Sequence, residues 1–305
     1  MAVVTGTAGS PESRSAPTAR SGRRANRSWL GVLPFFLFSA ALMAVPILFL
    51  VVGSLLDANS NFTLKNYADL ANDQIVNAYG TSIEISLVTA VAGGIFGFLL
   101  AYAVILGGLP RFLRAVLMTF SGVASNFAGV PLALAFTFTL GFQGLITKFL
   151  VDTFHIDLYS KQLGFSLYTK LGIEIVYLYF QFPLMVLIIA PALDGLKKEW
   201  REASENMGAS PRQYWQFVAL PILLPSILGS TVLLFGNSFG AQATAYQLTT
   251  GQIPLVTLLI GSQISGDVLH NPGLGYAMAM GMVVIMGVSI LAYSFLQRRS
   301  ERWLR

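Results

Sequence analysis

The 305-residue sequence contains no cysteine and only two histidines, His155 and His270. The missing thiols exclude disulfide frameworks, zinc–thiolate sites, iron–sulfur clusters and cysteine nucleophiles. Two histidines so far apart in the sequence do not predict a metal site. Charged residues make up only 11% of the chain, whereas a typical soluble domain has about 25%. We therefore expect neither a metalloprotein nor an ordinary soluble enzyme.

Motifs of nucleotide binding and hydrolysis are missing as well. No Gly-Lys dipeptide occurs, so the chain has no Walker A loop to hold phosphates. The H-E-x-x-H signature is also absent. The sequence predicts that this chain is not an enzyme, and that any energy for active transport comes from another chain.

Long apolar runs dominate what is present, since 54% of the residues are hydrophobic. A bilayer core needs roughly 20 apolar residues of helix. The sequence predicts an all-α membrane protein with six transmembrane helices, at 30–56, 79–106, 113–147, 171–193, 217–239 and 274–296. The third run is long enough for a span plus an extended exit. A shorter run at 253–264 predicts a helix at the membrane interface or one that dips back into it.

The basic residues define the expected topology. Fifteen of the nineteen Lys and Arg residues lie in the N-terminus, the segments 107–114 and 194–215, and the C-terminus. The positive-inside rule then places both termini in the cytoplasm, and the net charge of +5 reflects topology, with no nucleic acid as partner. We expect a disordered basic tail at 1–28, a six-helix transmembrane domain at 29–297 and a basic tail at 298–305.

The segment 194–215, between spans four and five, has the signals of a capped helix. Asp194 is a favourable N-cap, and Gly208 stands where a left-handed residue ends a helix. Ser210 to Gln213 reads as a capping box with proline at the first helical position. The expected apolar stripe contains Leu196, Trp200, Ala203 and Met207. The pattern alone fits both a helix resting on lipid headgroups and a helix that docks on a protein.

The amino-acid sequence of this segment resembles the EAA loop of permease subunits of binding-protein-dependent ABC importers. That pattern is E-A-A, three residues, G, nine residues, then I-x-L-P. The sequence matches it, with the same spacing, at Glu202, Ala203, Gly208, Leu220 and Pro221. It departs from it at Ser204 and Val218, both mild changes in size. The resemblance extends over roughly residues 30–300.

The resemblance implies a coupling helix that docks in a cleft of a separate ATPase. Glu202, Ala203 and Gly208 would dock, Leu196, Trp200 and Met207 would form the buried stripe, and Pro221 would mark the beginning of span five after Leu220. The implied partners are an ABC ATPase dimer that binds ATP and Mg²⁺, a second permease that is a different chain, an extracytoplasmic solute-binding protein and membrane lipid. This chain would need no cofactor. It would sit in a bacterial inner membrane and rock between inward-open and outward-open states.

The resemblance also implies a class of solute. Sugar-type members usually have Ile-Asp-Gly where this chain has Asn206-Met207-Gly208. The chain therefore looks more like permeases for polyamines, phosphonates, sulfate, iron or thiamine. Two alternatives stay open at this point: a sugar-type ABC permease and a secondary transporter driven by an ion gradient.

Polar residues within the predicted spans are candidates for a solute pathway. Asn126, Gln181 and Asn237 lie near the middle of their helices, where they either line the pathway or hydrogen-bond between helices. Glu84 and Glu174 lie at the outer ends of their helices, where we expect structural roles.

Three further expectations concern packing and capping. Lys170 precedes Glu174 by four residues and is expected to pair with it. Glycines four residues apart, in span two and at the end of span five, fit close packing either within the chain or in a dimer. The residues His270 and Asn271 are expected to cap span six.

Overall fold

A computed structural model describes residues 28–57, 60–160, 164–265 and 271–301. Residues 1–27 of the predicted tail at 1–28, His270 and residues 302–305 lie outside the described part. The chain divides into two units, residues 1–48 and 49–305, which are described separately. Within the described residues every regular element is a helix and no strand forms. This confirms the predicted all-α fold class.

The described part of the first unit is the beginning of α1 (Ser28–Ser54), whose last turns belong to the second unit. The helix contains no charged residue, and its large apolar side chains are exposed, among them Phe35, Phe38 and Met43. Apolar side chains exposed all around a helix of this length fit a lipid environment. This helix is the first of the six predicted spans.

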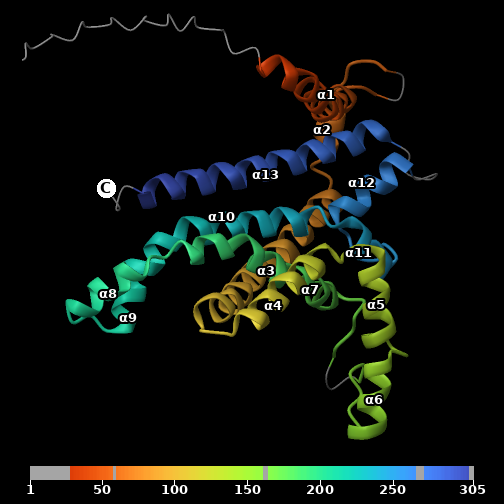
Figure 1. Ribbon diagram of the computed structural model, residues 1–305. Coiled ribbons are helices and arrows are strands. Elements are labelled where there is room, and N and C mark those ends of the chain that lie inside the picture. The colour runs from red at the N-terminus through yellow and green to blue at the C-terminus, as the bar shows by residue number, and fades with distance from the viewer. Residues whose placement is uncertain (1–27, 58–59, 161–163, 266–270, 302–305) are drawn as a thin grey trace, which may run out of the picture. The chain divides into compact units, whose positions relative to one another are not determined.

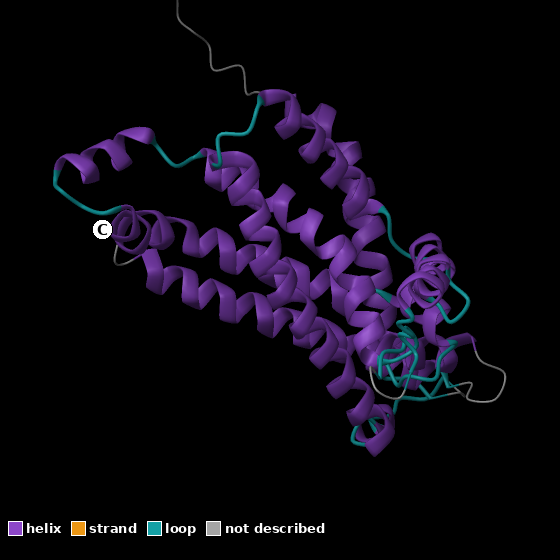
Figure 2. Cartoon of the chain, turned by 90° about the horizontal axis from the view of Figure 1, so that it is seen from below, coloured by secondary structure: helices purple, strands orange, loops and turns teal. Residues whose placement is uncertain are grey.

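The second unit contains the remaining helices. They are α2 (Lys65–Asp69), α3 (Asp73–Leu106), α4 (Arg111–Asn126), α5 (Val130–Leu140), α6 (Leu145–Phe154), α7 (Lys170–Asp194), α8 (Lys198–Asn206), α9 (Pro211–Tyr214), a π-helical turn (Trp215–Ala219), α10 (Leu220–Phe239), α11 (Gln242–Thr249), α12 (Val256–Ser265) and α13 (Pro272–Glu301). The long helices α3, α7, α10 and α13 run side by side (Figures 1 and 2).

Small residues allow α3 to pack closely on α7. Gly93 lies against Gln181, and Gly97 lies against Met185. A Cβ atom added at Gly97 would come within 2.5 Å of the Met185 Cβ atom, closer than real side chains approach. At the end of span five, Gly236 similarly lies against a methionine of α13. Of the two roles left open for these glycines, the structure shows packing within the chain.

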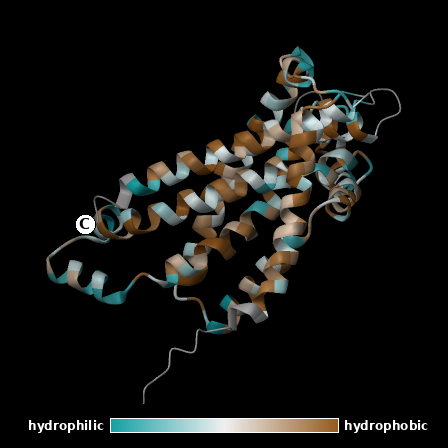
Figure 3. Ribbon diagram, turned by 90° about the horizontal axis from the view of Figure 1, so that it is seen from above, coloured by the Kyte–Doolittle hydropathy of each residue, from teal (hydrophilic) through white to brown (hydrophobic). Residues whose placement is uncertain are grey.

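Six segments are long and apolar enough to cross a membrane, which confirms the predicted number (Figure 3). The prediction of one continuous third span over 113–147 is wrong in its bounds. This region forms α4, α5 and α6, and the stretch Val130–Phe154 is the third candidate span. The first piece ends at Asn126, and Gly129, with a φ angle of +74°, precedes the second, which has Pro131 in its first turn. A positive φ followed by proline is incompatible with a continuous helix.

The two ends of the helix bundle differ in character. The hairpin of α8 and α9 lies at one end of α10, as does the end of α13, whereas α11 and α12 lie at the other end (Figure 1). Hydrophilic residues gather at this hairpin, and apolar residues cover the long helices (Figure 3). The helix α12 is the short apolar helix predicted around 253–264. The Asn271 side chain accepts a hydrogen bond from the backbone N–H of Leu274, which confirms its capping role.

Candidate coupling loop and solute cavity

The hairpin between α7 and α10 is a short helix closed by two backbone devices. Gly208 has a φ angle of +79°, the left-handed conformation predicted for it at the end of α8. The Ser210 hydroxyl then accepts from the Gln213 backbone N–H (3.3 Å), and the Ser210 N–H donates to the Gln213 side chain (2.7 Å). This is the predicted capping box. Together the two devices set the angle between α8 and the helix that follows.

The beginning of the hairpin differs from the prediction. Asp194 does not cap α8 but is the last residue of α7, and the residue that precedes α8 is Lys197. Both carboxylate oxygens of Asp194 accept from Arg114 of α4, at 2.8 and 2.7 Å. The apolar run of α7 continues without a break as far as Leu193, so the helix reaches Asp194 and places it near this partner.

The predicted apolar stripe is also not one continuous face. Leu196 lies before α8 and packs against the core of the bundle. Trp200 is half-buried, with the Lys197 ammonium 5.7 Å from its ring centre. Met207 follows the last residue of α8 and its side chain is 80% exposed. The periodicity assumed one helix from 196 to 207, whereas α8 has only nine residues.

Residues of the EAA-like pattern point in different directions. Ser204 is buried, and its hydroxyl donates to the Arg201 carbonyl (2.7 Å). Glu202 and Ala203 are exposed, as is Met207. The hairpin therefore presents an outer surface of acidic, small and apolar residues, which no other described residue of this chain covers.

The helix that leaves the hairpin contains a π-helical turn at Trp215–Ala219, directly before Pro221. In this turn the Leu220 N–H bonds to the Trp215 carbonyl, one residue further back than in an α-helix. Pro221 has no N–H and its ring would crowd the carbonyl four residues earlier, so the wider turn suits it. The helix itself begins at Pro211, so Pro221 does not mark its start as the resemblance implied.

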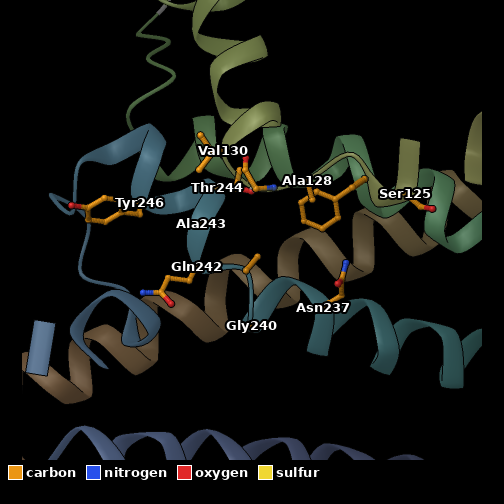
Figure 4. A pocket seen from close by; sticks show the side chains of 12 residues that line it. Ser125, Ala128, Val130, Asn237, Gly240, Gln242, Ala243, Thr244 and Tyr246 are labelled. Carbon is orange, nitrogen blue, oxygen red and sulfur yellow. The ribbon is translucent and has the colours of Figure 1, made fainter. Parts of the chain in front are cut away.

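A cavity of about 580 Å³ lies at the other end of α10 (Figure 4). It is formed by the break between α4 and α5, one residue of α7, the end of α10 and the beginning of α11. No charged side chain belongs to its lining, which consists of Ser125, Ala128, Gly129, Val130, Phe180, Asn237, Gly240, Ala241, Gln242, Ala243, Thr244 and Tyr246. The cavity is therefore polar but neutral.

Two hydrogen bonds hold the walls of this cavity together. The backbone N–H of Gly129 donates to the Thr244 hydroxyl at 2.9 Å, which ties the helix break to α11. The Tyr177 hydroxyl of α7 donates to the Ala241 carbonyl at 2.5 Å, which fixes the connection between α10 and α11. The helices α5 and α11 both begin at the cavity, and neither is capped by the side chain of its own N-cap residue.

The three predicted pathway residues have different surroundings. Asn237 lines the cavity. Asn126 is exposed beside it but is not part of the lining, and its amide donates to the Gly122 carbonyl (2.8 Å). Gln181 is fully buried between helices and donates to the Leu234 carbonyl (2.9 Å), while its side-chain oxygen has no partner among the described residues. Gln181 thus hydrogen-bonds between helices, which is the second of the two roles considered for these residues.

Sequence reasoning missed the α11 wall of the cavity. Gln242, Thr244 and Tyr246 lie outside the predicted spans, because α11 has only eight residues and no apolar periodicity. The signal that was available is the cluster of polar side chains directly after the last apolar residue of α10. Nothing in the sequence, however, places this cluster next to Gly129.

Glu84 and Glu174 lie outside both features. Lys170 pairs with Glu84 of α3 at 2.7 Å, and the predicted pair of Lys170 with Glu174 is therefore wrong. Both paired side chains are about half exposed, so the pair contributes little to stability in water. No group of three potential metal ligands occurs among the residues that the structure describes.

The comparison with known families decides the class of the protein. The family model described as "Binding-protein-dependent transport system inner membrane component" matches residues 93–305. The chain belongs to this family. It is a permease subunit of an ABC importer, a multi-pass inner-membrane protein that is not itself an enzyme. The alternative of a secondary transporter is thereby excluded.

Several curated relatives of this permease are sulfate permeases by name. It is 31% identical to the sulfate transport system permease protein CysT of Salmonella typhimurium, over 68% of this chain and 73% of that one. It is 27% identical to the probable sulfate transport system permease protein cysT of a Helicosporidium species, over 82% of this chain and 88% of the relative. It is 24% identical to the spermidine/putrescine transport system permease protein PotB of Haemophilus influenzae, over 81% and 85%.

Solved structures share the permease fold. A chain of a bacterial ABC transporter involved in the import of alginate matches with a TM-score of 0.63 and 16% identity, over 90% of this permease and 99% of that chain. A chain of the MetNI methionine ABC transporter matches with a TM-score of 0.50 and 16% identity, over 75% and 99%. At this identity the likeness concerns the fold alone.

Proposed function

We propose that the α8–α9 hairpin is the coupling loop through which the permease docks on its ATPase. Glu202, Ala203 and Met207 form the docking face, Trp200 supports it and Gly208 sets its shape. The observation that supports this most directly is Met207, an apolar side chain that is 80% exposed in a mostly polar hairpin. Apolar side chains exposed in this way, on a rigid and capped element, are typical of a protein interface.

The hairpin also fixes the proposed orientation. Most of the basic residues lie in the segments assigned to one side, which include the hairpin, and the positive-inside rule makes that side cytoplasmic. The end of α13 lies at the hairpin end of the bundle, so the C-terminus is cytoplasmic in this orientation (Figure 1). An even number of spans then places the N-terminus on the same side.

The neutral cavity is the proposed part of the solute pathway in this chain, with Asn237 as a solute contact. A second permease, a different chain, completes the pathway, and an extracytoplasmic binding protein delivers the solute. One structural neighbour was solved with a periplasmic protein bound to an alginate pentasaccharide, which supports such a partner. ATP and Mg²⁺ bind to the ATPase, and this chain needs no cofactor.

A small oxyanion of the sulfate class is the proposed solute. The names of several relatives support it, and so does the absence of Asp and Glu from the cavity lining. A polyamine, the cargo named for PotB, would leave its ammonium groups without a carboxylate there. Hydroxyl and amide donors suit an oxyanion, which needs to bind weakly enough to leave again.

Replacing Gly208 tests the coupling loop. Gly208→Val forces a β-branched residue into the left-handed region, at a cost of about 1–3 kcal/mol. We expect about tenfold less ATPase to copurify with this variant, and uptake to fall with it. Gly208→Asn is the matched control, because asparagine tolerates the left-handed conformation and no atom lies within 4 Å of an added Cβ. Normal assembly and uptake by Gly208→Val would refute the proposed coupling role of the hairpin.

Replacing Asn237 tests the solute pathway. Asn237→Leu removes a polar contact from the cavity, and we expect the kcat/KM of radiolabelled sulfate uptake to fall about tenfold. Asn126→Leu is the matched control, because the Asn126 amide lies at the end of α4, outside the lining. This substitution should change uptake less than twofold. Uptake of putrescine in place of sulfate would contradict the proposed solute. Equal effects of both substitutions would contradict the role of the cavity.

A further inference from the structure

An open pocket lies behind the hairpin. It is a pocket of about 470 Å³ between α8 and α9 on one side and the end of α3 on the other. Lys198, Arg201 and Glu205 line it from one face of α8, since they follow one another at helical spacings of three and four. Glu202, Ala203 and Met207 are not part of the lining. The pocket therefore stays accessible when a protein covers the outer surface of the hairpin.

The charge of this pocket is positive. Three cationic side chains, Lys197, Lys198 and Arg201, line it together with a single carboxylate, that of Glu205. The carboxylate pairs with the Nε atom of Arg201 at 2.8 Å. One guanidinium edge is thus engaged, and the two lysine ammonium groups add positive charge that no carboxylate of the lining balances. An anion is the ligand that this arrangement favours.

The remaining walls of the pocket are mainly apolar and aromatic, with Ser210 as a polar exception. Ile105 and Leu106 at the end of α3 form part of them, together with Leu196. Tyr102 and Trp215 meet edge to face there, with ring centres 5.1 Å apart. Tyrosine and tryptophan concentrate where a membrane protein meets the headgroup layer. The pocket thus offers cations on one side and apolar surface on the other, at the expected depth of the inner headgroups.

We propose that this pocket binds the headgroup of an anionic phospholipid from the cytoplasmic leaflet. The phosphodiester lies against Lys197, Lys198 and Arg201, and the first part of the acyl chains lies along Ile105 and Leu106. A basic pocket at the cytoplasmic ends of transmembrane helices is a recurrent form of lipid headgroup site. The inference rests on the proposed cytoplasmic position of the hairpin. It makes the hairpin a contact both for the ATPase, on its outer surface, and for lipid, on its inner surface.

Lipid binding to the assembled transporter tests the proposal. The complex is purified in mild detergent, incubated with phosphatidylglycerol and examined by native mass spectrometry. Neutralising two charges with Lys197→Gln and Lys198→Gln should lower the apparent affinity for this lipid about thirtyfold. Lys198→Gln alone should lower it about fivefold, and as a single exposed substitution it leaves the fold intact. Arg111→Gln with Arg212→Gln is the matched control, because both residues are exposed and lie outside the pocket lining.

The possible outcomes distinguish lipid binding from the binding of soluble anions, and the lipid site from the transport function. Unchanged phosphatidylglycerol binding by the Lys197 and Lys198 variants, or an equal loss in the control, would overturn the proposal. Competition by the water-soluble glycerophosphoglycerol at the same concentration as the lipid would show a site for soluble phosphates instead. The experiment measures phosphatidylglycerol binding, so its result does not depend on ATPase docking or on sulfate uptake. Normal assembly and uptake by Gly208→Val would refute the proposed coupling role of the hairpin and would leave the lipid result unaffected.

Discussion

At the scale of single residues, the bundle depends on positions where no side chain fits. At Gly97, an added Cβ would come within 2.5 Å of the Met185 Cβ atom and 2.9 Å of the Phe182 carbonyl oxygen. One of these neighbours is backbone, which cannot rotate away as a side chain does. The close contact between α3 and α7, the two central helices, therefore requires a residue without a Cβ atom at this position.

We expect Gly97→Ala to destabilise the permease by about 1–3 kcal/mol, because it overpacks this contact. Gly80→Ala in the same helix is the control, since no atom lies within 4 Å of its added Cβ. Alanine there should raise stability by up to about 1 kcal/mol through helix propensity. The thermal midpoint of the purified complex distinguishes them, and equal midpoints for the two variants would contradict the packing argument.

Residues whose role is local were predictable, whereas residues with a distant partner were not. The left-handed Gly208 and the capping box at Ser210 depend on neighbours within four positions, and both were predicted correctly. Asp194 and Lys170 have partners on other helices, eighty or more positions away. Local spacing assigned one to a cap and the other to a pair within its helix, and both assignments were wrong.

At the scale of elements, the number and type of helices followed from composition, but their interruptions did not. Long apolar runs predicted six spans, since only helices satisfy their own backbone in lipid. The break at Gly129 and the π-helical turn before Pro221 both arise from glycine or proline within an apolar run. Such residues show that a helix is disturbed, and only the structure shows whether it ends or widens.

We expect Pro221→Ala to remove the reason for the π-helical turn. Alanine restores an N–H that can bond to the Phe217 carbonyl, and a regular α-turn becomes available. Such a change alters the rotation of the hairpin relative to α10, so the amount of solute transported per ATP should fall while the thermal midpoint does not. Hydrogen exchange over residues 215–221 reports the change in bonding directly.

Pro225→Ala is the control for this prediction. Pro225 lies within α10 where no π-helical turn precedes it, so its replacement should leave the ratio of transport to ATP hydrolysis unchanged. An unchanged ratio and unchanged exchange in Pro221→Ala would show that the turn has another cause.

At the scale of the whole molecule, composition alone predicts an orientation in the membrane, whereas the cavity could not be predicted from the sequence. The asymmetry of Lys and Arg is a property of composition and needs no contact between segments. The cavity depends on the meeting of Gly129 and Thr244, which are 115 positions apart. Of the three polar residues proposed for the pathway, Asn237 alone lines it, because helical rotation decides which residues face inward.

The ion pair of Arg114 and Asp194 lies between the hairpin and the cavity in the sense that it holds α4, which extends from one to the other. It holds the first turn of α4 to the last turn of α7, directly before the hairpin begins. The helix α4 has 16 residues, a length of about 24 Å, and the residue before its last, Ser125, lines the cavity. The helix α4 therefore has one end beside the hairpin and the other in the cavity wall. We expect a displacement of this helix at the hairpin end to move the cavity wall as well, because α4 is continuous between the two.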